Sequence, residues 1–555
     1  MSESSQVASL LNEFGRRAML YGGNPYRAKA YLRAAERVAL LTEPLDDLVI
    51  QQRLQEIPGV GDAIAGVITQ LCQTGSHPSL ERMRADVPAS VLELLTIPGL
   101  RPDKVMKVHK ELGINTIEEL ETAVRKDRLK PIKGLGGALQ RKILAGLEAR
   151  QSSTPARHMH RAAELLSAAE ASLKRSNLNL KKIVVAGDLR RCCELVSNLA
   201  LAGQQPGATT KSQKFGELTV YMASPSRFGA ALLFATGSDS HLNQLQKLAR
   251  KKGFSLDETG LYLDEKRVAA RTEAEIYGAL GLPFIEPELR EGRGEIALAR
   301  KRRLPNLIRA QDIRGILHAH TAASDGVNTL RQMAEATRKR GYSYFGVADH
   351  SKSAHYAGGL SIEEITAQHE LIDELNADYK NEFQVFKGIE SDILPDGSLD
   401  YPDEVLARFD FVVASVHGQF RKHRTSQTER ILRAVANPYT TILGHMTGRQ
   451  LLRRAGYDVD IDTVLAACAE HGVAVEINAN PWRLDLDWRW HQRGLELGCI
   501  YSINPDAHST SEIDLTRWGL AMARKGGVPS KRVLNALDLR SFREHLWDRK
   551  TFHSK

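Results

Sequence analysis

The sequence predicts a chain of several domains, partly all-helical and partly α/β. Its 555 residues exceed the usual size of one domain, and typical sizes suggest roughly three to five domains. Apolar residues recur at intervals of three and four through residues 1–150, without an alternating strand pattern. From residue 312 onward, strand-like runs alternate with helix-like segments, as in parallel βα barrels. We therefore expect a helical domain at 1–150, an α/β domain at 158–285, a linker at 286–311 and a barrel at 312–555.

The composition is that of an ordinary globular protein, with 42% hydrophobic and 26% charged residues. No apolar run approaches the ~20 residues of a membrane span, and the first residues lack the order of a signal peptide, so we expect a cytoplasmic protein without a membrane partner. Five cysteines at no framework spacing fit a reducing compartment. The net charge of +9 favours a polyanionic partner such as DNA, although a basic enzyme with another substrate has the same balance.

Three loops in the helical region place glycines between two helical segments. Glycine before a helix lets backbone amides approach a phosphate without a Cβ in the way. The loops resemble the helix-hairpin-helix motif, which grips the DNA backbone without reading bases. The alternative is a helical bundle in which the glycines only turn the chain, and the middle loop departs from the motif with Arg101 at its second glycine. The resemblance implies DNA-backbone contacts at Gly59, Gly61, Gly99, Gly134 and Gly136.

The stretch 158–285 contains KKIVVAGDLRR, a strand followed by a glycine and two arginines. It resembles the nucleotidyltransferase core of bacterial family-X DNA polymerases, in which three aspartates on neighbouring strands hold two magnesium ions. Asp188 stands where that family has a serine. Asn198 and Ala200 stand where it has the paired aspartates, and the third carboxylate falls at Glu217. An amide and a methyl group cannot supply the charge that two Mg²⁺ ions require, so we expect a degenerate domain without polymerase activity.

Residues with metal-binding side chains follow successive strand-like runs in the barrel region. The run GILHAH places two histidines two residues apart, so on a strand both imidazoles would face the same way. The carboxyl ends of barrel strands meet at one face, which would bring such residues together. A single histidine at a strand end is usually structural, and we leave out His355, His471 and His491 on that ground. The predicted metal ligands are His318, His320, Asp325, His350, Glu390, His417, His445, Asp506 and His508.

The motifs HAH, DHS, GIE, SVH, GH and DAH resemble those of the polymerase and histidinol phosphatase (PHP) domain. The resemblance implies a distorted (β/α)7 barrel that holds three divalent ions, Mn²⁺ or Zn²⁺, at the nine residues named above. Imidazole with carboxylate also suits Fe²⁺, whereas Mg²⁺ and Ca²⁺ prefer oxygen ligands. The order of helix-hairpin-helix, polymerase-like and PHP regions resembles bacterial family-X polymerases over nearly the whole chain.

Basic residues near these motifs are candidates for binding phosphate. Lys352 follows DHS, Arg449 follows GHMTG, and Arg483 lies in ANPWRLDL, so each could contact a substrate phosphate at the mouth of the barrel. The linker carries a further basic run, Arg300–Arg303. Such a run could touch DNA, but a charged run in a linker is usually just solvated.

These features predict a metal-dependent DNA phosphodiesterase, a 3′-to-5′ exonuclease or 3′-end-processing enzyme of DNA repair whose polymerase activity is lost. One alternative is a small-molecule phosphomonoesterase of the histidinol-phosphatase kind, and another is a non-catalytic DNA-binding scaffold with structural metals. The sequence leaves open the metal, the preference among exonuclease, 3′-phosphatase and abasic-site endonuclease activity, the oligomeric state, the protein partners, the repair pathway and any residual nucleotide binding by the degenerate domain.

Overall fold

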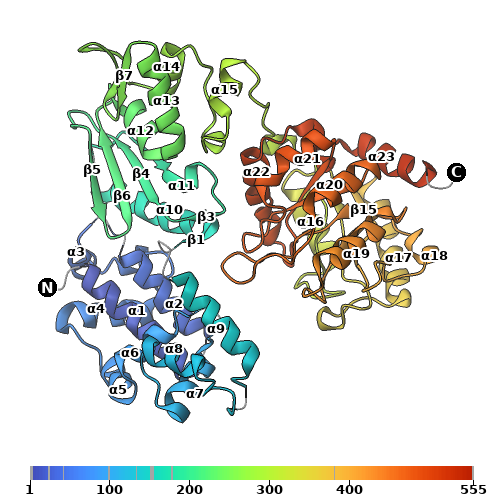
Figure 1. Cartoon of the computed structure of the whole chain (residues 1–555), viewed down its shortest axis with the longest axis horizontal. Helices are drawn as coiled ribbons and strands as arrows, with labels where there is room; N and C mark the ends of the chain where they lie inside the picture. The colour runs from blue at the N-terminus through green and yellow to red at the C-terminus, as the bar shows by residue number, and fades with distance from the viewer. Residues whose placement is uncertain are drawn as a thin grey trace. The chain divides into compact units, whose positions relative to one another are not determined.

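The computed structural model describes residues 4–22, 25–39, 41, 43–97, 100–132, 134–150, 156–176, 179–380 and 382–552. The chain divides into two compact units (Figure 1). Within the described residues, no helix is both long and apolar enough to cross a membrane. The first unit comprises Met1–Arg157, Arg161–Arg190 and Leu195–Gly281, and the second comprises His158–His160, Arg191–Glu194 and Leu282–Lys555.

The first part of unit 1 contains helices and turns, as expected for residues 1–150, and no strand among the residues described. Two hydrophobic cores form there, one around Phe14 and Tyr31, whose rings lie 4.5 Å apart, and one around Val91 and Leu120. Apolar residues three or four apart on each helix build these cores. The helices are α1 (Ser4–Leu20), α2 (Pro25–Val38), α3 (Leu45–Ile50), η1 (Leu54–Glu56), α4 (Asp62–Thr74), α5 (Pro78–Asp86), α6 (Ala89–Leu94), α7 (Pro102–Leu112), α8 (Ile117–Arg125) and α9 (Gly137–Arg150).

The rest of unit 1 is α/β. Its four-stranded sheet has the order β2-β4-β6-β5, in which β4 and β6 are parallel and the other pairs antiparallel. Phe228 and Leu232 of α12 pack against Ala186 and Ala200 of the sheet. The elements are β1 (Arg157–His158), α10 (Met159–Ser176), β2 (Lys182–Ala186), α11 (Gly187–Arg190), β3 (Leu195–Val196), β4 (Leu199–Gln204), β5 (Lys211–Phe215), β6 (Leu218–Ala223), α12 (Phe228–Thr236), α13 (Asp239–Lys251), an antiparallel β7 (Phe254–Asp257), β8 (Gly260–Leu263) and β9 (Lys266–Ala269), and α14 (Glu273–Ala279).

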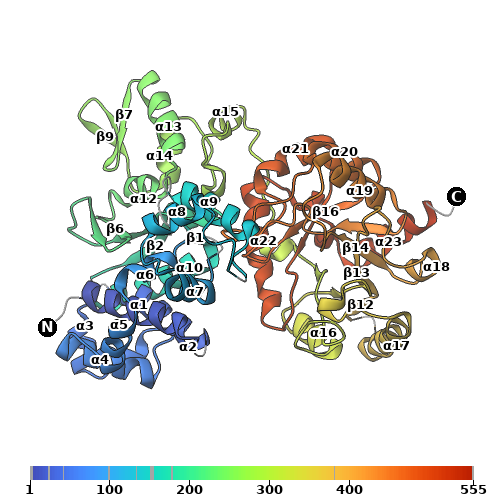
Figure 2. The same cartoon turned by 60° about the horizontal axis from the view of Figure 1, so that its bottom comes forward.

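Unit 2 is a barrel of parallel strands surrounded by helices (Figure 2). One sheet has the order β10-β11-β12 and the other β13-β14-β15-β16-β17. Bridges between Ala319 and Ala507 and between His350 and Glu390 join the two sheets into a ring. Since only Lys387 separates β12 from β13, the described strands occupy seven positions, which confirms the predicted distorted (β/α)7 barrel. The strands are β10 (Gly315–Ile316), β11 (Tyr344–Gly346), β12 (Gln384–Phe386), β13 (Gly388–Asp392), β14 (Phe411–Ser415), β15 (Thr440–Leu443), β16 (Ala474–Asn478) and β17 (Tyr501–Asn504).

The barrel strands are apolar and buried along most of their length because helices cover their outer face. Helices α16 and α17 begin with capping boxes, in which Thr329 and Ser361 accept a bond from the amide three residues on. The helices are α16 (Leu330–Lys339), η4 (His355–Ala357), α17 (Ile362–Tyr379), α18 (Asp403–Leu406), α19 (Arg424–Ala436), α20 (Ile461–Glu470), η5 (Trp488–Trp490), α21 (His491–Leu497), η6 (Glu512–Leu515), α22 (Thr516–Lys525), η7 (Ser530–Arg532), η8 (Leu534–Ala536) and α23 (Leu539–Phe552).

The stretch 286–311, expected as a linker, is folded against the barrel. It contains η2 (Pro287–Leu289), α15 (Glu295–Arg300) and η3 (Ala310–Asp312). Arg524 of α22 holds it at two points, through a 2.6 Å ion pair with Glu288 and a 3.0 Å bond to the Ile308 carbonyl. The charged run thus serves as part of unit 2, although the domain boundaries themselves stay predictions.

Candidate metal centre

The nine predicted ligands lie where the strands of the barrel end, and the structure brings all of them together. Loops after parallel strands meet at one face of a barrel, so residues far apart in sequence converge there. His318, His320 and Asp325 follow β10, His350 follows β11, Glu390 lies in β13, His417 follows β14, His445 follows β15, and Asp506 and His508 follow β17.

The potential ligand atoms form four overlapping groups, and within each group they lie within 4.8 Å of one another. Glu390 belongs to two groups, which it can serve through its two carboxylate oxygens. Such sharing of ligands is typical of centres with more than one ion. The groups are His320, Asp325, His350 and His508; His318, His320 and Asp506; His318, Glu390 and His445; and His350, Glu390 and His417.

Glu390 lies at the middle of the cluster. Its Oε1 is 3.0 Å from His445 Nε2 and 3.3 Å from the Nε2 atoms of His318 and His417. Its Oε2 is 3.0 Å from His350 Nδ1. Burial alone would raise the pKa of Glu390, but the surrounding imidazoles, led by His417, hold it well below the usual range. The carboxylate is therefore charged and faces ligand nitrogens on both sides.

The two histidines of the HAH motif converge by a different geometry from the one the sequence predicts. Strand β10 ends at Ile316, so the prediction that both histidines lie on the strand is wrong. His318 has a φ of +57°, a left-handed conformation that is uncommon for a residue with a side chain. This turn brings His318 Nε2 to 3.7 Å and His320 Nε2 to 3.2 Å from Asp506 Oδ1.

Two carboxylates outside the predicted set hold ligand imidazoles from behind. Glu476 in β16 lies 2.5 Å from His318 Nδ1, and Asp392 in β13 lies 2.5 Å from His417 Nδ1. A proton on each Nδ1 leaves the Nε2 atom free to bind a metal. The sequence carries a signal for both, since Glu476 interrupts an apolar strand and Asp392 lies two residues after Glu390, on the same strand face.

Several ligand nitrogens are buried without a hydrogen-bond partner among the described residues. They are His318 Nε2, His320 Nδ1 and His350 Nδ1, which lie near carboxylates without hydrogen-bonding geometry. A buried polar atom without a partner costs free energy unless a further group binds it. Divalent cations would satisfy these nitrogens and balance the neighbouring carboxylates, so the donor set fits metal ions.

The pKa values of His417 and His508 are raised by neighbouring carboxylates, as expected at a site that binds cations. Burial alone would lower the pKa of His417, but Glu390 and Asp392 raise it to about 10. Burial would likewise lower the pKa of His508, whereas Asp325 raises it to about 9. Protons occupy these imidazoles in the absence of metal, and metal binding releases them.

Exposed apolar side chains lie in the loops around this cluster. Tyr356 is 71% exposed, with its ring 6.1 Å from the His350 ring and 6.3 Å from the His417 ring. Val327, whose amide donates to the His508 carbonyl, is also exposed. No periodic pattern in the sequence marks these residues. An apolar rim suits a partner with flat apolar groups.

The three predicted phosphate-binding residues differ in their surroundings. Arg483 Nε lies 3.7 Å from Asp506 Oδ2, at the edge of the cluster, and Lys352 is exposed. Arg449, in the loop after β15, is bonded to the loop after β16, with NH1 2.8 Å from Asp487, Nε 3.0 Å from the Arg483 carbonyl and NH2 bonded to the Leu484 carbonyl. The phosphate-binding role of Arg483 and Lys352 stays a prediction, whereas Arg449 ties the loop after β15 to the loop after β16.

Comparison with known proteins agrees with this geometry. A PHP-domain model matches residues 317–480, a DNA polymerase beta thumb model matches 231–291, and helix-hairpin-helix models match 2–77 and 91–149. The protein named DNA polymerase/3′-5′ exonuclease PolX of Bacillus subtilis (strain 168) is 33% identical over 550 residues, covering 94% of this chain and 95% of the relative. The chain belongs to the PolX family. Family-X polymerases with a PHP domain are thus its relatives over nearly the whole length.

Shorter relatives of this PolX chain carry another name. A protein named Probable phosphatase of Thermoanaerobacter sp. (strain X514) is 26% identical over 250 residues, covering 42% of this chain and 94% of the relative. A second one, of Vibrio campbellii (strain ATCC BAA-1116), is 26% identical over 231 residues, covering 39% and 86%.

The residues that correspond to the polymerase site are separated in the part of this PolX chain that the structure describes. Ala200 is buried in β4 and pairs with Thr219 of β6, while Asn198 lies exposed just before β4. Glu217 lies just before β6 and forms an ion pair with Arg157. Among the described residues, the groups of three or more side chains that could hold a metal ion all lie in the barrel and none lies here.

Arg190 of the polymerase-like site is already bonded to neighbouring side chains. Arg190 donates two bonds to Glu273, at 2.9 and 2.6 Å, and a third to Thr236 at 2.6 Å. Asp188 accepts bonds from the amides of Ser197 and Asn198. These groups satisfy one another within unit 1, so the PolX fold persists there with its polar groups already paired.

The helix-hairpin-helix loops keep the predicted geometry where the structure describes them. Gly59 and Gly134 have φ values of +80° and +88°, which a side chain would strain. A Cβ at these positions would lie 2.5 Å from Arg37 NH1 and 2.9 Å from Lys104 Nζ, so a cation flanks each loop. Gly61 caps α4, and Gly136 precedes α9. Gly99 lies outside the described residues, and Arg101 caps α7.

Proposed function

We propose that this PolX chain is a divalent-metal-dependent phosphodiesterase that removes nucleotides from DNA 3′ ends as a 3′-to-5′ exonuclease. The observation that carries the proposal is the convergence of six imidazoles and three carboxylates in four overlapping groups. A purely structural metal site would be satisfied by about four ligands. The Bacillus subtilis relative, which has 3′-5′ exonuclease in its name, supports the same function.

The ligand set suits three divalent ions, Mn²⁺, Zn²⁺ or Fe²⁺, at the nine predicted residues. When bound, such ions supply Lewis-acid stabilisation for the charge that develops on phosphate during hydrolysis. The protein keeps this site rigid, because Glu390 contacts four imidazoles. Glu476 accepts a hydrogen bond from Nδ1 of His318, and Asp392 accepts one from Nδ1 of His417. These bonds fix the orientation of the two imidazoles.

The surroundings of the centre favour DNA as substrate. Arg483 and Lys352 would bind the phosphate beside the scissile bond, and the exposed ring of Tyr356 would stack on an unpaired terminal base. The glycine loops at Gly59 and Gly134, each flanked by a cation, would hold the duplex backbone. A small metabolite would need neither the loops nor the apolar rim.

Polymerase activity is lost in this proposal, because Asn198 and Ala200 offer no charge for magnesium and Arg190 is engaged by Glu273. The degenerate core would instead help to place the DNA end. The predicted domain boundaries and a cytoplasmic location, where DNA is repaired, belong to the same proposal.

Incubation of the purified protein with Mn²⁺ and end-labelled single-stranded, recessed and abasic DNA tests the proposal. We expect release of mononucleotides from 3′ ends, lost in the variant His318→Ala with His320→Ala. No release, or release that this variant leaves unchanged, would contradict it. Release of phosphate or cutting only at abasic sites would assign the same centre to another DNA substrate.

The second candidate is a phosphomonoesterase for small substrates, and it is supported by the relatives named Probable phosphatase. The two functions separate in a direct competition between a recessed DNA end and a small phosphate ester. A kcat/KM for the ester that exceeds the value for DNA would favour the phosphatase.

A further inference from the structure

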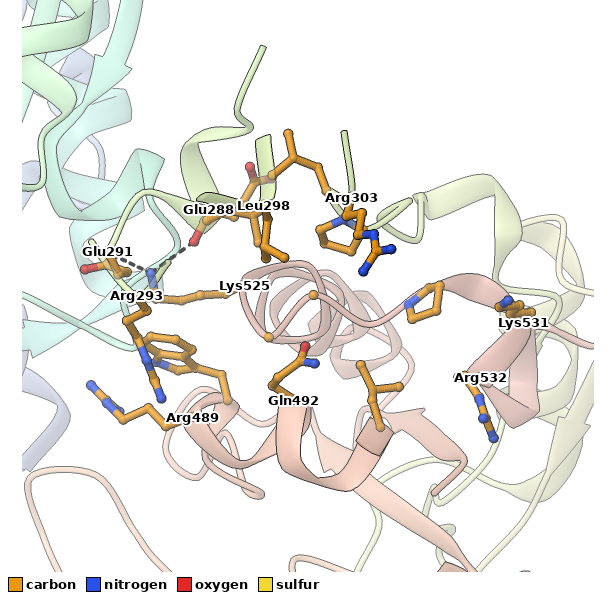
Figure 3. A pocket seen from close by; sticks show the side chains of 18 residues that line it. Glu288, Glu291, Arg293, Leu298, Arg303, Arg489, Gln492, Lys525, Lys531 and Arg532 are labelled. Carbon is orange, nitrogen blue, oxygen red and sulfur yellow. Dashed lines mark hydrogen bonds and ion pairs between the residues drawn. The ribbon is translucent and has the colours of Figure 1, made fainter. Parts of the chain in front are cut away.

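A groove of about 480 Å³ opens in unit 2 beside the end of α22 and the start of α21 (Figure 3). The folded stretch 288–305 forms one wall, and the loop 526–532 contributes to the floor. None of the nine candidate metal ligands lines this groove. Its volume falls within the roughly 300–1,000 Å³ of small-molecule sites, so it is a second candidate site.

Cationic side chains lie at both ends of the groove. Figure 3 shows Arg293 and Arg489 at one end and Lys531 and Arg532 at the other, with Arg303 on the wall above. Arg293, Arg303 and Lys531 are exposed, and Arg293 lies 5.1 Å from the Trp488 ring. Arg489 already forms ion pairs with Glu194 at 2.6 Å and with Asp487 at 2.9 Å. Positive charge at two ends suits an anion, or an elongated ligand with more than one.

The carboxylates of the groove are already neutralised. Glu288 lies 2.6 Å from Arg524 Nε, and Glu291 lies 2.6 Å from Lys525 Nζ. In the part of the chain that the structure describes, neither Arg303 nor Lys531 forms an ion pair. Arg303 and Lys531 can therefore pair with an anionic ligand.

The middle of the groove is apolar. Leu298 remains 42% exposed there, and Leu304, Pro305, Leu495 and Pro529 continue the surface around it. The Gln492 side chain lies between the two charged ends (Figure 3) and offers both a donor and an acceptor. A simple anion such as phosphate would make no use of this apolar middle.

We propose that the groove binds a nucleotide. Its phosphate would lie on the cations at one end, its base would cover Leu298 and Pro305, and the Gln492 amide would bond the edge of the base. A free mononucleotide and one unit of a DNA strand present the same chemistry to these side chains. Binding here does not depend on the function of the metal centre.

The test is calorimetric titration of the full chain in EDTA, so that metal–phosphate contacts at the other centre are absent. The probes are thymidine 5′-monophosphate, a six-nucleotide oligothymidylate and inorganic phosphate. The variant Arg303→Glu with Lys531→Glu is compared with Arg300→Glu plus Lys301→Glu, which makes the same charge change at exposed residues outside the groove.

We expect the groove variant to weaken monophosphate or oligonucleotide binding about tenfold or more, as two charge-assisted contacts are lost, and the control to change it little. Weaker monophosphate binding assigns the groove to free nucleotide, and weakening confined to the oligonucleotide assigns it to a DNA strand. Leu298→Ser should weaken nucleotide binding but not phosphate binding. Three results would overturn the proposal. The groove and control variants could have equal effects, the unmodified chain could bind neither nucleotide, or it could bind phosphate as tightly as the monophosphate.

Discussion

The metal centre and the polymerase-like core of this chain arrange their charged side chains in opposite ways. In the core, Arg190 is held by Glu273, and Glu217 is held by Arg157. In the metal centre, carboxylates crowd around buried imidazoles, and nitrogens such as His318 Nε2 have no hydrogen-bond partner among the described residues. Charged groups that pair with one another leave no site for a ligand, whereas a buried cluster of imidazoles and carboxylates with unpartnered nitrogens is arranged to bind one.

The largest expected effect is on activity and comes from Glu390→Gln. Glu390 contacts four ligand histidines, so an amide there removes charge from two groups at once. We expect Mn²⁺-dependent release of nucleotides to fall about 10³-fold. The exposed Glu363→Gln is the matched control. Activity of Glu390→Gln near that of the control would break the comparison.

The next effect concerns metal affinity and comes from Asp392→Asn. Asp392 holds the Nδ1 proton of His417, and loss of such a supporting carboxylate weakens metal binding about 10- to 100-fold. Competition with a chelator measures this, with the surface variant Asp378→Asn as control. If both variants bind Mn²⁺ equally well, Asp392 does not orient the ligand.

Glu273→Gln should affect stability rather than activity. It leaves the Arg190 guanidinium without its charged partner, and both side chains are largely buried, 16% and 6% exposed. Because the pair is not fully buried, we expect the free energy of unfolding to fall by about 2 kcal/mol. Urea unfolding measures the change against the exposed Glu265→Gln. A fall in nuclease activity without loss of stability would place Glu273 in a functional site.

Tyr356→Ala should act on DNA alone. Loss of a stacked base costs on the order of 1–3 kcal/mol, so KM for a single-stranded 3′ end should rise about tenfold or more. Tyr356→Phe should keep the stacking, and hydrolysis of a small chromogenic phosphodiester should be unchanged in both variants. An equal loss with the small substrate would mean that Tyr356 supports the metal centre instead.

The smallest expected effect is a pH dependence from His491, a buried histidine outside both centres. Burial lowers its pKa from 6.5 to about 4, and this effect outweighs the opposing hydrogen bond to the Leu486 carbonyl and the charge of Asp487. The unfolded chain therefore binds more protons than the folded one between these values, and stability is lost as the pH falls through that window. His491→Gln should flatten this part of the stability profile in urea unfolding. An identical slope would contradict the buried neutral state.

Much of the barrel and of its cluster could be predicted from the sequence. Strand-end positions fix which residues share one face, so the nine candidate ligands converge although His318 lies in a turn rather than on a strand. The spacing of motifs does not show which way a long side chain points. The sequence predicts that Arg449 faces a substrate phosphate, but it bonds the carbonyls of Arg483 and Leu484, a contact that no motif indicates.

Other parts of the site depend on tertiary packing. Glu476 reaches His318 across the barrel, from a strand more than 150 residues away, and only the closed ring brings the two together. The stretch 286–311 has the composition of a linker, yet Arg524 ties it to the barrel. Charge and composition do not distinguish a solvated linker from a segment that packs against a domain.

One measurement tests the central claim that the metal centre is the working site and the polymerase-like core is not. A labelled primer annealed to a longer template is incubated with the protein, Mn²⁺ and all four deoxynucleoside triphosphates, and the primer length is followed. We predict shortening from the 3′ end, which Glu390→Gln abolishes. Template-dependent lengthening of the primer, or shortening that Glu390→Gln leaves intact, would contradict the account.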